Sequence, residues 1–241
     1  IPDADEAAIA RQFLAPIRQM SGISRFSATD LRKQLSGKAA DVSPYVGRNE
    51  HGLRGSTSPK DLETLMQLVY LNFTAPRFDP DDFGTFYNQY KGYLENMNSN
   101  PDYLFKKQLL QTLYDGNERA QIISAELLDK VNFSRLSAIN RMLFPDANEF
   151  VFTFVGNIDP EVLKPLVEKY IGSIPTTKDR LELVDDHVDI VTGQVSEDFN
   201  TVMQQPKVSV FFGFSGTENY SLKNNLVLTM LCEALSTRYH E

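Results

Sequence analysis

The stretch that decides the fold covers residues 150–175 and reads FVFTFVGNIDPEVLKPLVEKYIGSIP. Its first six residues are apolar or β-branched, which favours a short buried strand over residues 150–155. A Gly-Asn pair then turns the chain. Asp159 followed by Pro160 is a typical helix start, and the apolar spacing after it predicts a helix that ends near Ile171. The stretch therefore predicts a strand, a turn and a helix, in that order.

The chain before this stretch is mainly helical in pattern, with one hairpin. Residues 38–46 and 49–57 predict two strands joined around a Gly-Arg-Asn turn. Hairpin strands among many helices favour an α+β fold, with an antiparallel sheet packed against helices, over a doubly wound sheet. Apolar periodicity and capping residues predict helices over residues 4–20, 27–35, 58–73, 80–97, 101–113, 122–130 and 134–143.

Two of these helices have specific start signals. Ser27 and Asp30 have the spacing of a capping box. Ser58 precedes a proline at the first helical position and an acid at the third, Asp61, so we expect Ser58 to be the N-cap of its helix.

The pattern fades after residue 173 and the chain becomes acidic, which indicates a linker. A new strand is predicted over residues 207–214, and a new helix begins at Ser221. We therefore divide the chain into a first domain over residues 1–178, an acidic linker over 179–206, and the truncated start of a second domain over 207–241.

The composition is that of an ordinary globular protein, with 41% hydrophobic and 23% charged residues among 241. The formal net charge of −8, without any cluster of Lys and Arg, argues against a nucleic-acid partner. No apolar run approaches the roughly 20 residues that a transmembrane helix needs. The chain opens without Met and stops inside a helical pattern, so we interpret it as a segment of a longer parent.

The single Cys232 excludes an internal disulfide and a cysteine-based metal cluster. Because apolar residues flank it in a helical pattern, we expect Cys232 to be packed rather than reactive.

The three histidines do not form a metal site in the sequence pattern. Residues 47–51 read GRNEH, an inverted H-x-x-E-H motif whose first His is replaced by Gly. These residues lie in the predicted hairpin, where positions i and i+4 do not share the face that a helix would give them. We expect a solvated surface around His187 in the acidic linker, and His240 stands alone near the end.

Residues 213–217 read GFSGT and resemble the serine elbow G-x-S-x-G. The last Gly is a Thr, and only His240 follows, so the pattern predicts a turn at a strand end. No glycine pattern typical of phosphate binding occurs. The residues therefore predict no catalytic side chain and no metal ligand in this segment, and they assign no substrate-binding residue.

Several segments resemble one enzyme family. Residues 154–161 and 163–175 resemble the strand, "GN-x-D" turn and helix near the end of pitrilysin/insulinase-type zinc metalloprotease domains. Residues 26–35, 55–63 and 74–79 are similar to the same proteases, specifically to the second, inactive half of long bacterial members built from two homologous halves. The order and spacing of these segments cover most of the chain.

In catalytic members of that family the inverted H-x-x-E-H lies on the first helix. The corresponding residues 12–16 read QFLAP here. Phe13 and Leu14 match the middle of the family's usual "HFLEH", whereas both His and the Glu are absent. The resemblance therefore implies common ancestry without catalysis.

The resemblance implies repeated α+β units like those of mitochondrial processing peptidase, with two halves that close around an unfolded peptide. This segment would be a non-catalytic part of a zinc-dependent metalloendopeptidase and hold no cofactor itself, with the zinc in the other half of the parent. Its partners would be that catalytic half and a peptide substrate. The bacterial type implies the periplasm or cell envelope, and an acidic inner wall would favour basic peptides.

Two alternatives use the same fold. One is a separate non-catalytic partner subunit, as in processing-peptidase pairs. The other is a structural assembly subunit like the related core proteins of respiratory complexes.

Overall fold

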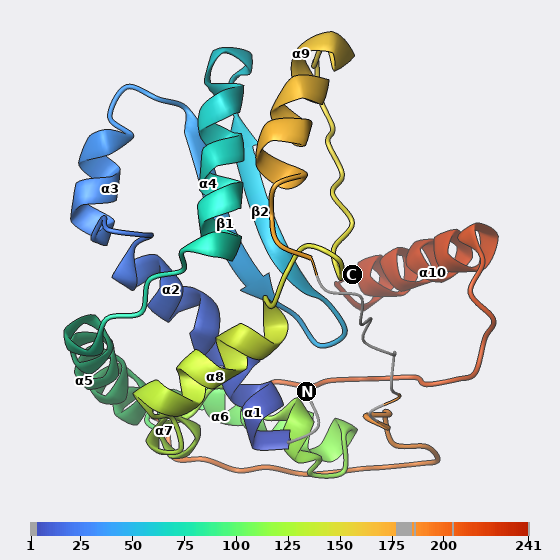
Figure 1. Cartoon of the computed structure of the whole chain (residues 1–241). Helices are drawn as coiled ribbons and strands as arrows, with labels where there is room; N and C mark the ends of the chain where they lie inside the picture. The colour runs from blue at the N-terminus through green and yellow to red at the C-terminus, as the bar shows by residue number, and fades with distance from the viewer. Residues whose placement is uncertain (1–3, 177–184, 186, 204, 241) are drawn as a thin grey trace.

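The computed structural model describes residues 4–176, 185, 187–203 and 205–240. A two-stranded antiparallel hairpin stands at the centre of Figure 1, with helices packed around it and below it. The predicted α+β fold is confirmed. The strands are β1 (Ala40–Val46) and β2 (His51–Thr57).

The described helices agree with the sequence prediction, with small shifts at their ends. The helix predicted over residues 122–130 begins only at Ala125. The α-helices are α1 (Ala4–Ile9), α2 (Ala15–Ser21), α3 (Ala28–Gln34), α4 (Leu62–Thr74), α5 (Pro80–Met97), α6 (Pro101–Leu113), α7 (Ala125–Asp129), α8 (Phe133–Leu143), α9 (Pro160–Leu166) and α10 (Leu222–His240). Shorter turns are the π-helical η1 (Ala10–Leu14) and η4 (Val167–Ile171) and the 3₁₀ turns η2 (Pro59–Asp61) and η3 (Glu118–Ala120).

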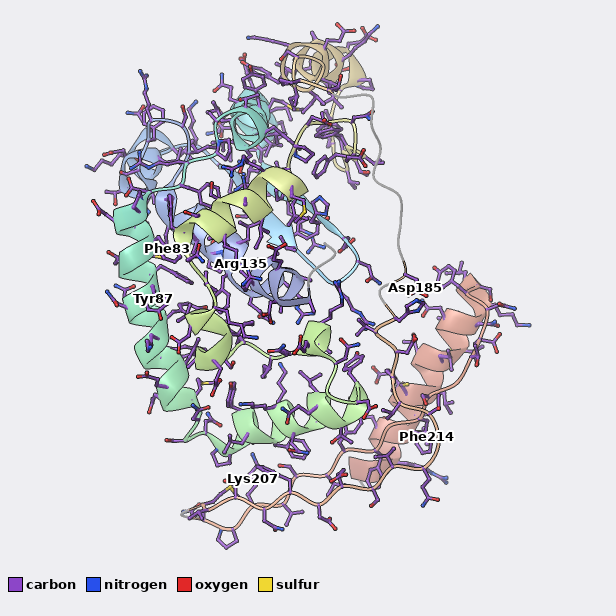
Figure 2. The ribbon with its side chains drawn as sticks, turned by 60° about the horizontal axis from the view of Figure 1, so that its bottom comes forward. Phe83, Tyr87, Arg135, Asp185, Lys207 and Phe214 are labelled. Carbon is purple, nitrogen blue, oxygen red and sulfur yellow. The ribbon has the colours of Figure 1, made fainter. Side chains whose placement is uncertain are left out.

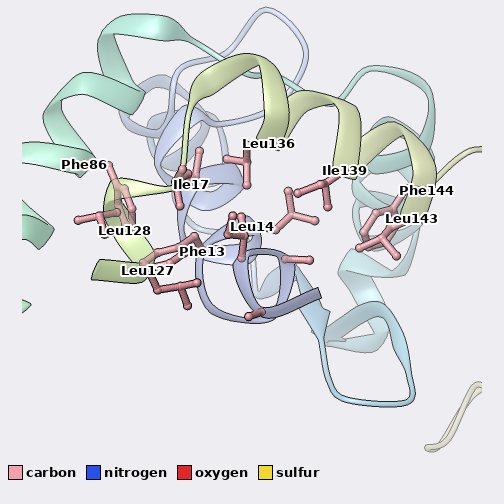
Figure 3. Close-up of a cluster of buried hydrophobic side chains, with 14 of the residues drawn as sticks. Phe13, Leu14, Ile17, Phe86, Leu127, Leu128, Leu136, Ile139, Leu143 and Phe144 are labelled. Atoms are coloured by element: carbon pink, nitrogen blue, oxygen red, sulfur yellow. The ribbon is translucent and has the colours of Figure 1, made fainter. Parts of the chain in front are cut away.

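The first helix supplies the centre of the core. It runs through α1, η1 and α2, and Phe13 and Leu14 on its inner face are fully buried. Figure 3 shows them between side chains of α8 and of α7. The Phe13 ring meets the ring of Phe86 edge to face, with centroids 6.4 Å apart. Each fully buried side chain of this size contributes about 1.5–3 kcal/mol through burial, so the core fixes the first helix in place.

Gly22 ends this helix at a position that only glycine fits. Its φ is +81°, and a Cβ there would lie 2.3 Å from the carbonyl oxygen of Phe26. Both facts explain the predicted stop.

The hairpin is confirmed in position and register. Ala40 pairs with Thr57 at one end and Val46 with His51 at the other. The turn closes with a hydrogen bond from the Gly47 N–H to the Glu50 carbonyl, 2.7 Å. Helix α4 packs on this hairpin and fixes its orientation.

Both predicted N-cap residues lie where the sequence places them, but their side chains form different hydrogen bonds. The Ser27 hydroxyl accepts the N–H of Asp30 at 3.1 Å, as predicted. Ser58 is the N-cap of η2, the 3₁₀ turn that leads directly into α4, with Pro59 and Asp61 in the first turn as predicted. Its hydroxyl accepts no backbone N–H but donates to the Asp61 carboxylate at 2.8 Å, and the Ala39 N–H donates to the same carboxylate at 3.0 Å.

Residues 150–155 do not form the predicted strand. They are extended and alternate as a strand would, with Val151 and Val155 92% and 90% exposed and Phe150, Phe152 and Phe154 half-buried. The rings of Phe150 and Phe152 pack on Phe73, with centroids 4.9 and 6.1 Å from it. Side-chain packing therefore holds this segment where no neighbouring strand among the described residues supplies a hydrogen-bond ladder.

The helix after the Gly-Asn turn is confirmed. Asp159 caps α9 by accepting the N–H of Glu161 at 2.9 Å, and the helix continues through η4 to Ile171.

The last part of the chain lies apart from the core. The predicted boundary between residues 178 and 179 lies outside the described residues. Residues 207–214 belong to no strand of the described sheet, so the predicted strand is not formed, and Val208 and Phe214 are 87% and 89% exposed. Lys207 lies below α6 in Figure 2 and forms an ion pair of 2.5 Å with Asp102 of that helix.

Helix α10 forms as predicted, with the Ser221 hydroxyl accepting the N–H of Asn224 at 3.1 Å. The prediction that Cys232 is packed is wrong: it is exposed, because the described residues place no element over its side of α10. None of the described helices is both long and apolar enough to span a bilayer.

Candidate functional site

The segment that corresponds to the zinc motif in catalytic relatives is part of the core here. Phe13 and Leu14 point into the core, and Gln12 is half-buried with its amide 3.4 Å from the carbonyl oxygen of Gln121. A π-helical turn runs through these residues, a feature that is frequent at functional sites. Among the described residues no three His, Cys, Asp or Glu side chains gather as a metal site would require.

His51 is an aromatic packing residue at the edge of the core. Its ring lies edge to face between Phe144 and Phe150, at centroid distances of 5.5 and 5.4 Å. Its buried Nε2 has no hydrogen-bond partner in the described part of the chain. Burial lowers the pKa of His51, and a hydrogen bond with the backbone of Leu143 opposes this shift. The geometry is that of an aromatic ring packed at the edge of the core.

The other sequence candidates lie on the surface. His187 is exposed, and its Nδ1 lies 3.4 Å from the Asp185 carboxylate. The hydroxyl of Ser215 donates to the carbonyl oxygen of Val191 at 3.3 Å. The side chain of His240 lies outside what the structure describes.

Three cations from distant parts of the sequence line one pocket of about 590 Å³. Arg11 comes from η1, Arg48 from the hairpin turn and Lys106 from α6; we call this the basic pocket. The Arg11 guanidinium donates from Nη1 to the carbonyl oxygen of Arg119 and from Nη2 to that of Gln121, both at 2.8 Å. The loop around η3 therefore holds Arg11 in a fixed orientation.

The charge of the basic pocket is not balanced within the described residues. Burial, followed by the like charge of Arg48, lowers the pKa of Arg11. Arg48 lies over the ring of Tyr114, 5.3 Å from its centroid. The carboxylate of Asp102 also lines the pocket, but it pairs with Lys207. Within the described chain, none of the three pocket cations lies within 4 Å of a carboxylate.

A second, larger cavity of about 820 Å³ lies beside β2, and we call it the hairpin cleft. It is bounded by β2, by α4, by residues 149–159 and by the first turn of α9. Its walls are mostly apolar and aromatic, for example Leu53, Leu65, Phe73, Phe152 and Phe154. Among the described residues β2 pairs only with β1, so its other edge is open.

Neither cavity has a local signature in the sequence. The pocket cations are separated by tens of residues and lie in segments with different predicted structures. One wall of the hairpin cleft is the segment 150–155, which the sequence predicts as a strand but which pairs with no other strand among the described residues. Its position depends on the packing of its Phe rings, which the sequence does not reveal.

Comparisons with known proteins relate the chain to one group of proteases. The family model described as "Peptidase M16 inactive domain" matches residues 142–240. The chain is 22% identical to the probable zinc protease PqqL of Escherichia coli (strain K12) over 154 residues. This match covers 64% of this chain and 16% of that protein. It is 28% identical over 116 residues to the zinc protease PQQL-like of Arabidopsis thaliana, covering 48% of this chain and 12% of that protein. The chain thus spans less than a fifth of the length of either relative.

The fold is shared with a solved structure. The crystal structure of the periplasmic protease PqqL from Escherichia coli matches with a TM-score of 0.61 and 20% identity, covering 77% of this chain and 21% of that chain. The family match over residues 142–240, the two relatives and this shared fold together support the pitrilysin-type M16 peptidase family, and within it the inactive half, as what this chain is similar to.

Proposed function

We propose that this chain forms part of the wall of a substrate chamber in a zinc-dependent metalloendopeptidase, and binds unfolded peptide there without taking part in the chemistry. The hairpin cleft is the observation that supports this function. Catalysis and zinc would belong to the catalytic half of the same parent chain. The periplasm or cell envelope is the compartment that we propose, by analogy with the periplasmic PqqL.

The hairpin cleft has the properties of a site for an extended peptide. Alternate residues of an edge strand direct N–H and C=O groups away from their partner strand, where a peptide can add as a further strand. The open edge of β2 lies along the cleft, and residues 150–155 run extended on the other side. The apolar walls would bury alternate side chains of a bound peptide, whereas backbone hydrogen bonds would be independent of its sequence. Such a site suits unfolded chains of varied sequence.

The residues at the motif position support a non-catalytic role. A catalytic zinc needs several protein ligands and an open position for water. Phe13 and Leu14 are core residues, and neither Gln12 nor Pro16 beside them is a usual zinc ligand. The relatives are named zinc proteases, so the chemistry would come from another part of the parent.

Photo-crosslinking in the full-length parent protein tests this proposal. A photoreactive p-benzoyl-phenylalanine replaces the exposed, cleft-lining Val155, and in a control it replaces the exposed Gln34 of α3, which lies on the opposite side of the hairpin in Figure 1. Zinc is removed by a chelator and a labelled unfolded peptide is added. We expect a peptide adduct at position 155 and little at position 34. Equal yields at the two positions would show that the cleft is not a peptide site.

A further inference from the structure

We propose that the basic pocket binds a carboxylate group of the peptide, either an acidic side chain or the C-terminal carboxylate. The proposal rests on the function proposed above, because it assumes that peptide lies against this chain. It adds a charge preference that the apolar hairpin cleft cannot provide.

Arg11 presents its positive charge in a prearranged position. Two of its five N–H donors are used by the carbonyl oxygens of Arg119 and Gln121, which leaves others directed elsewhere. A guanidinium that is already fixed loses little conformational entropy when it binds an anion. The backbone around η3 thus positions a donor without neutralising it.

Without a ligand, the positive charges of the basic pocket repel one another and are partly buried. A bound anion would offset both effects. Arg11 is half-buried, and both burial and the nearby Arg48 disfavour its charged form. Lys106 adds a third positive charge to the same lining, while the carboxylate of Asp102 is engaged by Lys207. Burying like charges without a counter-charge is unfavourable, so a ligand with a negative charge gains free energy at this place.

The shape of the pocket favours a peptide over a small free anion. Its volume of about 590 Å³ greatly exceeds that of one carboxylate. Leu110 and Ile122 line it beside the ring of Tyr114, so an acidic residue could bury its neighbouring apolar side chain there. The pocket also adjoins Gln12, at the position where catalytic relatives carry their zinc motif.

The preference runs against the charge of the whole chain. The formal net charge is −8, and an acidic wall on its own would favour basic peptides. At the basic pocket the local field has the opposite sign. We therefore expect selection for acidic groups at this one position of the peptide.

Binding measurements on the full-length parent, with zinc removed by a chelator, test the inference. Fluorescently labelled peptides of one length would carry two Glu or two Gln, each with a free or an amidated C-terminus. We expect the peptide with free carboxylates to bind about tenfold more tightly than the amidated Gln peptide, the effect of a charge-assisted hydrogen bond. The two mixed peptides distinguish a side-chain carboxylate from the C-terminal one.

A pair of charge-matched variants assigns the effect to the pocket. The double variant Arg48→Gln, Lys106→Gln changes two exposed side chains and leaves the half-buried Arg11 in place. The control Arg25→Gln, Lys33→Gln removes the same charge from exposed positions outside the pocket. Because Arg11 remains, we expect the carboxylate preference to fall at least severalfold in the first variant and to persist unchanged in the second.

The outcomes separate the two proposals. If the native protein shows no carboxylate preference, or both double variants lose it equally, the pocket is not a carboxylate site. Crosslinking at position 155 would then still support a peptide-binding wall. If neither crosslinks nor peptide binding occur, the proposed function itself is wrong.

Discussion

Arg18 donates from Nη2 to both oxygens of Asn72, the backbone carbonyl at 2.9 Å and the side-chain Oδ1 at 2.8 Å. The contact joins α2 to α4 inside the core. The guanidinium also lies over the ring of Phe144, 4.6 Å from its centroid. Burial lowers the pKa of Arg18 to about 10. Two oxygen acceptors and an aromatic face thus stabilise the buried positive charge of Arg18, the role that a carboxylate usually has.

We predict that Arg18→Lys lowers the free energy of unfolding by about 1–3 kcal/mol, because an ammonium cannot reproduce the planar contact with Asn72 and Phe144. Urea titration followed by circular dichroism measures the change. The matched control is Arg25→Lys, whose guanidinium lies over Phe26 but is exposed. It should change stability by less than about 0.5 kcal/mol. Equal effects of both variants would contradict a special role for the buried contact.

We predict that His51 makes the fold less stable in mild acid. Its pKa is lowered by burial, so below pH 6.5 the unfolded chain binds a proton that the folded chain binds only at lower pH. The free energy of unfolding therefore falls as the pH drops from about 7.5 to 5.5. His51→Phe and His51→Gln differ in packing, yet both should remove the same part of this pH dependence. Urea titrations across the pH range measure it, and an unchanged slope in both variants would show that His51 does not titrate differently on folding.

Local signals predicted most elements but not the cavities. Asp159 and Ser27 have the chemistry that a helix start needs, so their helices could be read from a few residues. The apolar run over residues 150–155 predicts a strand, but a hydrogen-bond ladder also needs a neighbouring strand, which no local pattern specifies. Arg11 and Lys106 line the same pocket only because the tertiary fold brings η1 and α6 to it. The basic pocket therefore could not be found from spacing.

We predict that purified residues 1–241 retain no stoichiometric zinc after dialysis. The described residues bring together no group of His, Cys, Asp or Glu that could hold a metal, and residues 12–16 lack the two His and the Glu of the family's motif. Metal analysis measures the content, with Gln12→Ala, Pro16→Ala as a control that should not differ. One tightly held zinc per chain that is lost in the control would overturn this prediction.

We propose that residues 1–178 form one domain, that residues 179–206 are a linker, and that residues 207–241 begin a second domain. One strand-like segment and one helix cannot cover both of their apolar surfaces. We therefore predict that the amides of residues 207–214 exchange rapidly with solvent in this chain alone and slowly in the full-length parent. Hydrogen exchange with mass spectrometry measures both. The core helix α8 should be protected equally in the two proteins, and equal protection of residues 207–214 in both would show that the proposed boundary is wrong.

The exposed apolar segment near the end of the chain also makes aggregation a hazard. Residues 208–214 read VSVFFGF, seven residues with high β-propensity and with neither charge nor proline, a composition typical of cross-β assembly. Lys207 directly precedes these residues, and its positive charge opposes their association with other chains. Its ion pair with Asp102 also connects the segment to α6. Loss of the Lys207 charge would therefore raise the tendency of residues 208–214 to associate between chains.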